Sequence, residues 1–177
     1  FMYWYVVRQL KIVPYDRAKA VQYAREWAFK RNPRYYNFDK LGGDCTNFAS
    51  QVIYAGSGVM NYDKLNGWYY INLNNRSPSW TAVVYLYKFL TQNRGVGPFA
   101  SEVDAKDVLP GDIVQLSFHD GDDIFDHSPV IVSTGAVPSP ENILIAAHTY
   151  DRLDYPVSNY NYRRIRYLHI EGVRKWQ

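Results

Sequence analysis

The sequence predicts an α+β fold of one domain, in which N-terminal helices pack on an antiparallel β-sheet. Apolar residues recur at helical spacing before residue 100, and they alternate with polar residues at a period of two after residue 110. Helices followed by a run of strands with short connections favour an antiparallel sheet. The chain has 177 residues, 47% hydrophobic and 21% charged, which suits one folded core and excludes a disordered or collagen-like chain.

Three helices are expected in the first part of the chain. The first spans residues 16–33 and ends at Asn32-Pro33, and the second has Asp44 as its N-cap and stops at Gly56. A stretch rich in Gly, Asn and Tyr follows, and we predict a loop over 56–75. The third helix is expected over 77–95, from Ser77-Pro78 or Ser79 to Gly95.

The second part of the chain predicts four strands, separated by turn clusters that contain Gly and Pro. They are residues 112–118, 127–133, 142–147 and 164–170. We divide the chain into an N-terminal extension, residues 1–14, and a single domain, residues 15–177. The longest apolar run, residues 143–147, is much shorter than the roughly 20 residues that cross a bilayer, so no membrane-spanning segment is expected.

Charge, cysteine content and the first residues narrow the class of protein further. The net charge of +3 is mild, so we expect no nucleic-acid partner. One cysteine excludes an internal disulfide. The chain begins with Phe1 and shows no signal peptide, which suggests a trimmed piece of a longer, multidomain protein.

The one cysteine, Cys45, falls in the first turn of the second predicted helix. Unpaired N–H groups and the helix dipole stabilise a thiolate there, so we expect a lowered thiol pKa. Gly42 and Gly43 allow a sharp turn and leave the sulfur uncrowded. The adjacent carboxylate of Asp44 opposes a thiolate, and we predict that it caps backbone N–H groups of the helix instead of facing the sulfur.

Two of the four histidines lie where they could serve this cysteine. His127 begins one predicted strand and His148 ends the next, and these positions are neighbours when the strands pair antiparallel. Cys45, His127 and His148 could then act as nucleophile, base and orienting group. The same three residues could instead bind zinc, although no two of them have the close spacing typical of ligand pairs. The nucleophilic interpretation requires no metal and no cofactor.

Residues 43–51, Gly-Asp-Cys-Thr-Asn-Phe-Ala-Ser-Gln, resemble the signature of the bacterial putative amidase domain family. This family is a branch of the NlpC-type cell-wall cysteine peptidases, which have a papain-like fold. Shorter matches follow in the same order, at residues 67–68, 79–80, 111–113, 127–128 and 148–149. The resemblance covers residues 15–172, nearly the whole chain.

The resemblance implies a role for each matching residue. Cys45 would be the nucleophile and His127 the base, with His148, or alternatively Asp151, as the third residue. The side chains expected around the oxyanion or substrate are Tyr35, Asp44, Trp68 and Trp80. For the two tryptophans the core is the favoured place, although an exposed one would suit a sugar or peptide.

The family further implies an activity and a location. The reaction would be hydrolysis of amide bonds through a thioacyl intermediate, in a peptide or in peptidoglycan, by a secreted or cell-wall-associated protein. The aromatic content of 17% leaves an alternative from another class, an inactive aromatic-rich module that binds the cell wall.

Overall fold

The computed structural model describes residues 2–5, 7–121 and 123–177, and it confirms an α+β fold with an antiparallel sheet. Residues 1 and 6 of the predicted extension lie outside the described residues. The helices are α1 (Arg17–Trp27), α2 (Cys45–Ser57), α3 (Pro78–Thr81) and α4 (Val83–Gln92). The strands are β1 (Leu10–Val13), β2 (Tyr70–Asn72), β3 (Asn75–Arg76), β4 (Gly97–Val103), β5 (Ile113–Ser117), β6 (Val130–Ser133), β7 (Leu144–Ala147), β8 (Arg152–Pro156) and β9 (Arg164–Trp176).

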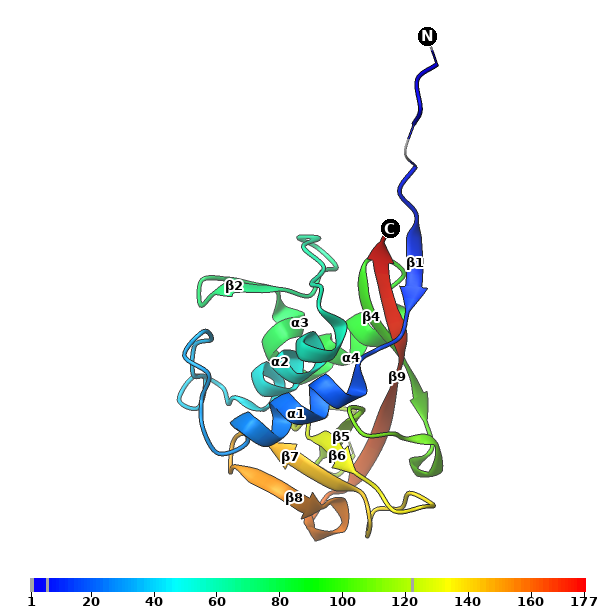
Figure 1. Cartoon of the computed structure of the whole chain (residues 1–177). Coiled ribbons are helices and arrows are strands. Elements are labelled where there is room, and N and C mark those ends of the chain that lie inside the picture. The colour runs from blue at the N-terminus through cyan, green and yellow to red at the C-terminus, as the bar shows by residue number, and fades with distance from the viewer. Residues whose placement is uncertain (1, 6, 122) are drawn as a thin grey trace.

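The main sheet has seven strands, and β9 pairs with three of them, β1, β4 and β5 (Figure 1). Tyr167 pairs with both Val103 and Val114, so β4 and β5 lie on opposite edges of β9. Further along β9, β1 pairs on the edge that β5 occupies. The sheet then continues through β6, β7 and β8, each antiparallel to the one before. Strand β6 begins at Val130, later than the predicted start at His127, so His127 lies three residues before β6, and His148 directly follows β7.

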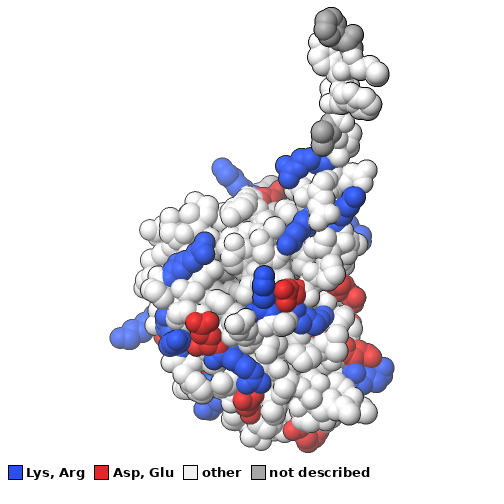
Figure 2. Space-filling view, in the orientation of Figure 1, with Lys and Arg blue, Asp and Glu red and all other residues white. Residues whose placement is uncertain are grey.

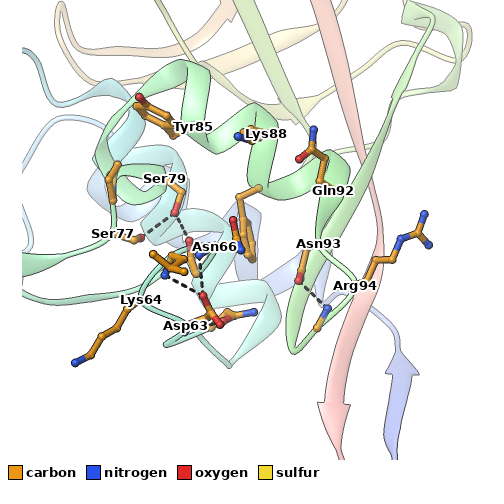
Figure 3. A pocket seen from close by; sticks show the side chains of 16 residues that line it. Asp63, Lys64, Asn66, Ser77, Ser79, Tyr85, Lys88, Gln92, Asn93 and Arg94 are labelled. Atoms are coloured by element: carbon orange, nitrogen blue, oxygen red, sulfur yellow. Dashed lines mark hydrogen bonds between the residues drawn. The ribbon is translucent and has the colours of Figure 1, made fainter.

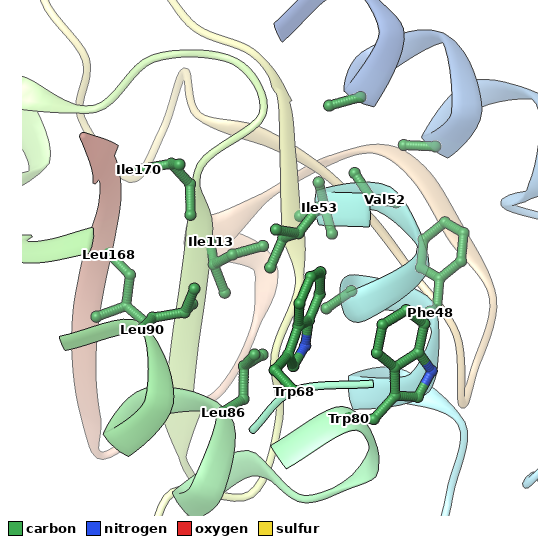
Figure 4. Close-up of a cluster of buried hydrophobic side chains, with 14 of the residues drawn as sticks. Phe48, Val52, Ile53, Trp68, Trp80, Leu86, Leu90, Ile113, Leu168 and Ile170 are labelled. Carbon is green, nitrogen blue, oxygen red and sulfur yellow. The ribbon is translucent and has the colours of Figure 1, made fainter. Parts of the chain in front are cut away.

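Both faces of the sheet bury apolar side chains, because successive residues of a strand point to opposite faces. Ile113 belongs to the larger core, which lies against α1, α2 and α4, whereas Val114 belongs to the smaller core on the other face. Figure 4 shows Trp68 and Trp80 within the larger core, beside Phe48 of α2. Helix α2 therefore begins and runs within a tightly packed environment.

The predicted helices exist, but their boundaries differ in three places. Helix α1 ends at Trp27, before the predicted end at Asn32-Pro33. Helix α2 continues through Gly56 to Ser57, and its C-cap Gly58 has a left-handed φ of 71°, which suits glycine. Gly56 instead allows close packing, since a Cβ there would lie 2.4 Å from the ring of Tyr15. The predicted third helix is split at Ala82, whose extended φ of −122° separates α3 from α4.

The sequence analysis missed five strands: β1, β2, β3, β4 and β8. The expected loop over 56–75 contains β2 and continues into β3, which pair as a small hairpin apart from the main sheet. β1 pairs with β9, although its residues fall within the expected extension. None of the described helices has the length and apolarity to cross a bilayer. On the face shown in Figure 2, basic and acidic side chains are interspersed.

Candidate active site

A glycine turn leads the chain into α2 and positions Cys45. Gly42 and Gly43 have φ values of +85° and +98°, which other residues rarely adopt. A Cβ at Gly43 would also lie 3.3 Å from the hydroxyl of Thr149, and that hydroxyl accepts a hydrogen bond from the Asp44 N–H at 2.8 Å. The turn thus brings the start of α2 against the residues that follow β7.

The Cys45 side chain is partly exposed and lies among hydrogen-bond donors. Burial raises the pKa of the thiol above its ordinary value, while the Thr46 hydroxyl and the backbone N–H groups of Ser128 and Thr46 lower it in part. The predicted drop in thiol pKa is therefore wrong, because removal of water outweighs the helix terminus. The backbone N–H of Cys45 itself has no acceptor among the described residues.

His127 directly precedes Ser128, whose backbone N–H contacts the Cys45 sulfur. A bridge to Leu116 fixes its backbone against β5, and its ring is largely buried. Burial lowers its pKa from 6.5 to about 4, and the charge of Asp126 opposes this. The imidazole is therefore neutral at pH 7.

The hydroxyl of Tyr160 is the hydrogen-bond partner of His127. It lies 3.3 Å from Nε2, and the two rings meet edge to face with centroids 5.5 Å apart. Burial raises the Tyr160 pKa, Arg152 lowers it in part, and the charges of Tyr155 and Cys45 raise it further. With Nε2 bonded to Tyr160, Nδ1 has no hydrogen-bond partner in the part of the chain that the structure describes.

Buried polar groups hold Ser128 and, through it, the neighbouring backbone. The Thr46 hydroxyl lies 3.4 Å from the Ser128 hydroxyl, and Gln115 Nε2 donates to that same hydroxyl at 3.2 Å. Gln115 also donates to the Val83 carbonyl and accepts from the Arg166 guanidinium. Helix α2, β5 and the segment before β6 are thereby joined beside the sulfur.

Asp44 occupies the N-cap position of α2 as predicted, but its carboxylate does not bond the backbone N–H groups of the helix, contrary to the prediction. Its buried carboxylate accepts hydrogen bonds from the Phe38 N–H and the Asn47 amide, both at 2.9 Å. Its other oxygen lies 2.5 Å from Nδ1 of His148 and 3.5 Å from Nε of Arg31. The negative charge beside Cys45 is therefore directed toward two basic side chains.

His148 joins Asp44 to α1 and does not orient His127, which corrects the expected arrangement. Its Nε2 lies 2.7 Å from the Trp27 carbonyl, and its ring stacks on Phe48. Because a carboxylate and a carbonyl only accept, the ring satisfies both when both nitrogens carry hydrogen. The pairing of β6 with β7 begins at Val130 and Ala146, so His127 lies outside it.

The remaining predicted residues are engaged in other contacts. Asp151 forms an ion pair with Arg31 at 2.9 Å. Tyr35 is buried with its ring against Tyr70 and Trp80, and burial raises its pKa to about 12. Trp68 and Trp80 are completely buried, and their indole N–H groups donate to Ser50 and Asn47. The tryptophans therefore have no surface for a substrate, which corrects their proposed role.

The zinc interpretation fails on the placement of the ligands. Both nitrogens of His148 are bonded to Asp44 and Trp27, away from His127. Across residues 2–5, 7–121 and 123–177, no three His, Cys, Asp or Glu side chains are grouped to hold a metal ion.

Sequence reasoning missed Tyr160, Ser128 and Gln115. Tyr160 is one of 17 tyrosines and is not part of any motif, so no local signal distinguishes it. Ser128 was visible beside His127 but had no role assigned to it. Gln115 faces the site only because β5 pairs between β9 and β6, which a local pattern does not reveal.

The comparisons with known proteins identify the family of the chain. The family model described as "Putative amidase domain" matches residues 14–170, so the chain belongs to this family. Amide hydrolysis is the activity that the family description indicates.

A curated relative and the solved structures add little beyond the family. The relative is described as "Uncharacterized protein YhbB" of Bacillus subtilis (strain 168), 37% identical over 140 residues. These residues are 77% of this chain and 42% of the relative, so the chain spans less than half of that protein. No solved structure matches the chain at a significant level.

Proposed function

We propose that the protein is a cysteine amidase that cleaves amide bonds in a peptide or in peptidoglycan through a thioacyl intermediate. The supporting observation is the start of α2, where the Cys45 thiol meets the Ser128 N–H, one residue after His127, whose ring is bonded by the Tyr160 hydroxyl. A nucleophile, a neutral base and a group that orients the base are the three parts that such a reaction needs.

In this proposal His127 takes the thiol proton as the sulfur attacks the amide carbonyl carbon. The backbone N–H of Cys45, which has no acceptor among the described residues, donates to the developing oxyanion. The C–N bond then breaks, and His127 passes its proton to the departing amine. Water, deprotonated by His127, attacks the thioester and releases the carboxylic acid and the thiol.

The resting states of the two groups suit base catalysis during attack. With the thiol pKa raised and the His127 pKa lowered to about 4, both groups are uncharged at neutral pH. The Tyr160 hydroxyl at Nε2 directs the opposite nitrogen, Nδ1, for proton transfer. Tyr160 therefore takes the positioning role that the sequence had assigned to His148.

The finer features of the family belong to the same proposal. We infer a papain-like fold of the NlpC type, with residues 15–177 as the catalytic domain and residues 1–14 as an extension. Peptidoglycan as substrate would require a secreted or cell-wall-associated protein, of which this chain would be one part.

The test uses the wild-type chain and Cys45→Ala with purified peptidoglycan and with soluble peptides. We expect wild type to release fragments with new amine and carboxylate ends, detected by mass spectrometry. Cys45→Ala should fold normally by circular dichroism and release none. An active alanine variant would exclude a cysteine mechanism, and an inactive wild type that still binds peptidoglycan would favour the binding module.

A further inference from the structure

A pocket of about 610 Å³ lies between the loop 61–67 and helix α4, and it shares no residue with the Cys45 cluster (Figure 3). Pockets of this size hold small-molecule ligands in other proteins, where about 300–1,000 Å³ is usual. The proposed function makes no use of this pocket.

The frame of the pocket is held by internal hydrogen bonds. The amide of Asn61 donates to the Val96 carbonyl at 3.0 Å, and that of Asn93 donates to the Pro98 carbonyl at 2.9 Å. Ser79 closes the other side, with its hydroxyl 2.6 Å from the Gly67 carbonyl. A binding site of fixed shape loses little entropy when a ligand binds.

Other polar groups of the pocket are not used by the protein. The side chains of Asn66, Tyr85 and Gln92 line it and have no hydrogen-bond partners in the described ranges. Figure 3 shows Tyr85 and Gln92 projecting from α4, with Asn66 on the facing loop. Amide groups both donate and accept, which matches hydroxyl groups, and the exposed ring of Tyr85 offers a flat surface.

The charge at the pocket is positive. Lys64, Lys88 and Arg94 line it, and within the described chain none of the three has an ion-pair partner. The one acidic residue of the lining, Asp63, accepts hydrogen bonds from the N–H groups of Leu65 and Asn66. These bonds lower the Asp63 pKa and occupy the carboxylate within its own loop.

We propose that this pocket is a second binding site, for a small anionic saccharide. The free amides and the Tyr85 hydroxyl would contact hydroxyl groups, and the three cations would attract a carboxylate or phosphate on the sugar. Hydroxyl recognition and charge are thus supplied by different residues, so both properties of the ligand contribute to binding.

The experiment titrates the isotope-labelled chain with cellobiouronic acid, a disaccharide with one carboxylate, and follows the amide signals by NMR. We expect shifts confined to the loop 61–67 and α4. Its neutral counterpart cellobiose and inorganic phosphate should each bind more weakly, because each lacks one of the two recognised features. No binding of the acid, shifts elsewhere, or equal binding of either control would overturn the proposal.

Substitutions of the lysines measure how much their charges contribute to binding of the acid. Lys64→Ala with Lys88→Ala should weaken binding of the acid about three- to tenfold, the range expected for two exposed charges. Lys106→Ala removes an exposed lysine outside the pocket and should leave binding unchanged. Unchanged binding in the double variant would exclude this site. Hydrolysis of a small amide substrate by Cys45 should persist in all variants, so this result and the proposed activity are tested separately.

Discussion

At the residue scale, the protonation states of Cys45 and His127 determine how the proposed pair can react. Burial acts in opposite directions on the two groups, raising the thiol pKa and lowering that of the imidazole. Both changes favour neutral groups, so the resting site is a thiol beside an imidazole. His127 then becomes charged only when it takes the thiol proton, as the sulfur attacks the substrate carbonyl carbon.

This resting state predicts slow alkylation of Cys45 by iodoacetamide at pH 7, because the thiolate is the reactive form. The rate should be below that of free cysteine at pH 7 and should rise steeply above pH 9, the ordinary value that the thiol pKa exceeds. The unfolded chain is the control and should react as free cysteine does. A folded protein that reacts faster than free cysteine at pH 7 would contradict the raised pKa.

Tyr160→Phe tests the group that bonds the base. The ring packing of Tyr160 remains while the hydroxyl at His127 Nε2 is lost. We expect kcat to fall by about tenfold, the effect of removing a group that orients a functional histidine, with KM little changed. Tyr162→Phe removes a hydroxyl nearby in the chain and should leave kcat unaltered. Equal losses in the two variants would remove the positioning role.

Residue identity alone predicted part of this site. Cys45 was predictable because glycines, an acidic residue and a helix start surround it within a few positions. The role of Tyr160 was not, because it depends on the path of the chain between β8 and β9. The sequence analysis identified His148 as a candidate functional residue, but its imidazole bonds Asp44 instead of orienting His127.

At the scale of secondary-structure elements, Asp44 connects four parts of the fold. Its carboxylate bonds the loop before α2, the first turn of α2 and the end of β7, and His148 extends the connection to the end of α1. The carboxylate and His148 are both buried, so their pairing with Arg31 nearby is shielded from water. The position of Cys45 depends on this connection.

Asp44→Asn should destabilise the folded protein by about 3 kcal/mol, since breaking a buried pair leaves an uncompensated charge. Urea unfolding measures this loss. Asp39→Asn is the matched control, because Asp39 also pairs with Arg31 but is much more exposed, and it should cost about 1 kcal/mol or less. Similar losses for the two variants would contradict the importance of the buried pair.

Secondary-structure boundaries depended on contacts that no local pattern contains. Gly56 was taken as a helix stop, yet its place opposite Tyr15 lets α1 and α2 approach closely within a continuing helix. Strand β1 is short and half-exposed, and only its pairing with β9 identifies it. The helices were predictable because a buried face gives them a clear period, whereas the seven-residue strand β4 was missed.

At the scale of the whole molecule, Asp112 joins the helical layer to the sheet. Its buried carboxylate accepts from Arg17 of α1 at 2.8 Å and from the Ile170 N–H of β9 at 2.9 Å. The ring of His169 lies 2.7 Å from its second oxygen. The bond to Asp112 is the largest factor that raises the His169 pKa above 6.5, while burial and Arg17 act against it. Folding therefore favours the protonated form of His169.

This preference gives the stability of the molecule a pH dependence of known sign. A histidine whose pKa is raised by folding contributes its full stabilisation below about 6.5, where it is protonated in both states. That contribution disappears as the pH rises through the pKa of the folded state. His169→Gln should consequently lower the free energy of unfolding more at pH 5.5 than at pH 9.

Comparing each variant with wild type at the same pH cancels the other titrating groups, including His127, whose lowered pKa acts in the opposite direction. His119→Gln, at an exposed histidine, controls for the loss of an imidazole. If the difference between wild type and His169→Gln is equal at the two pH values, the Asp112–His169 bond does not favour the protonated ring. A larger difference in the free energy of unfolding at pH 9 would instead mean that the neutral form of His169 stabilises the fold.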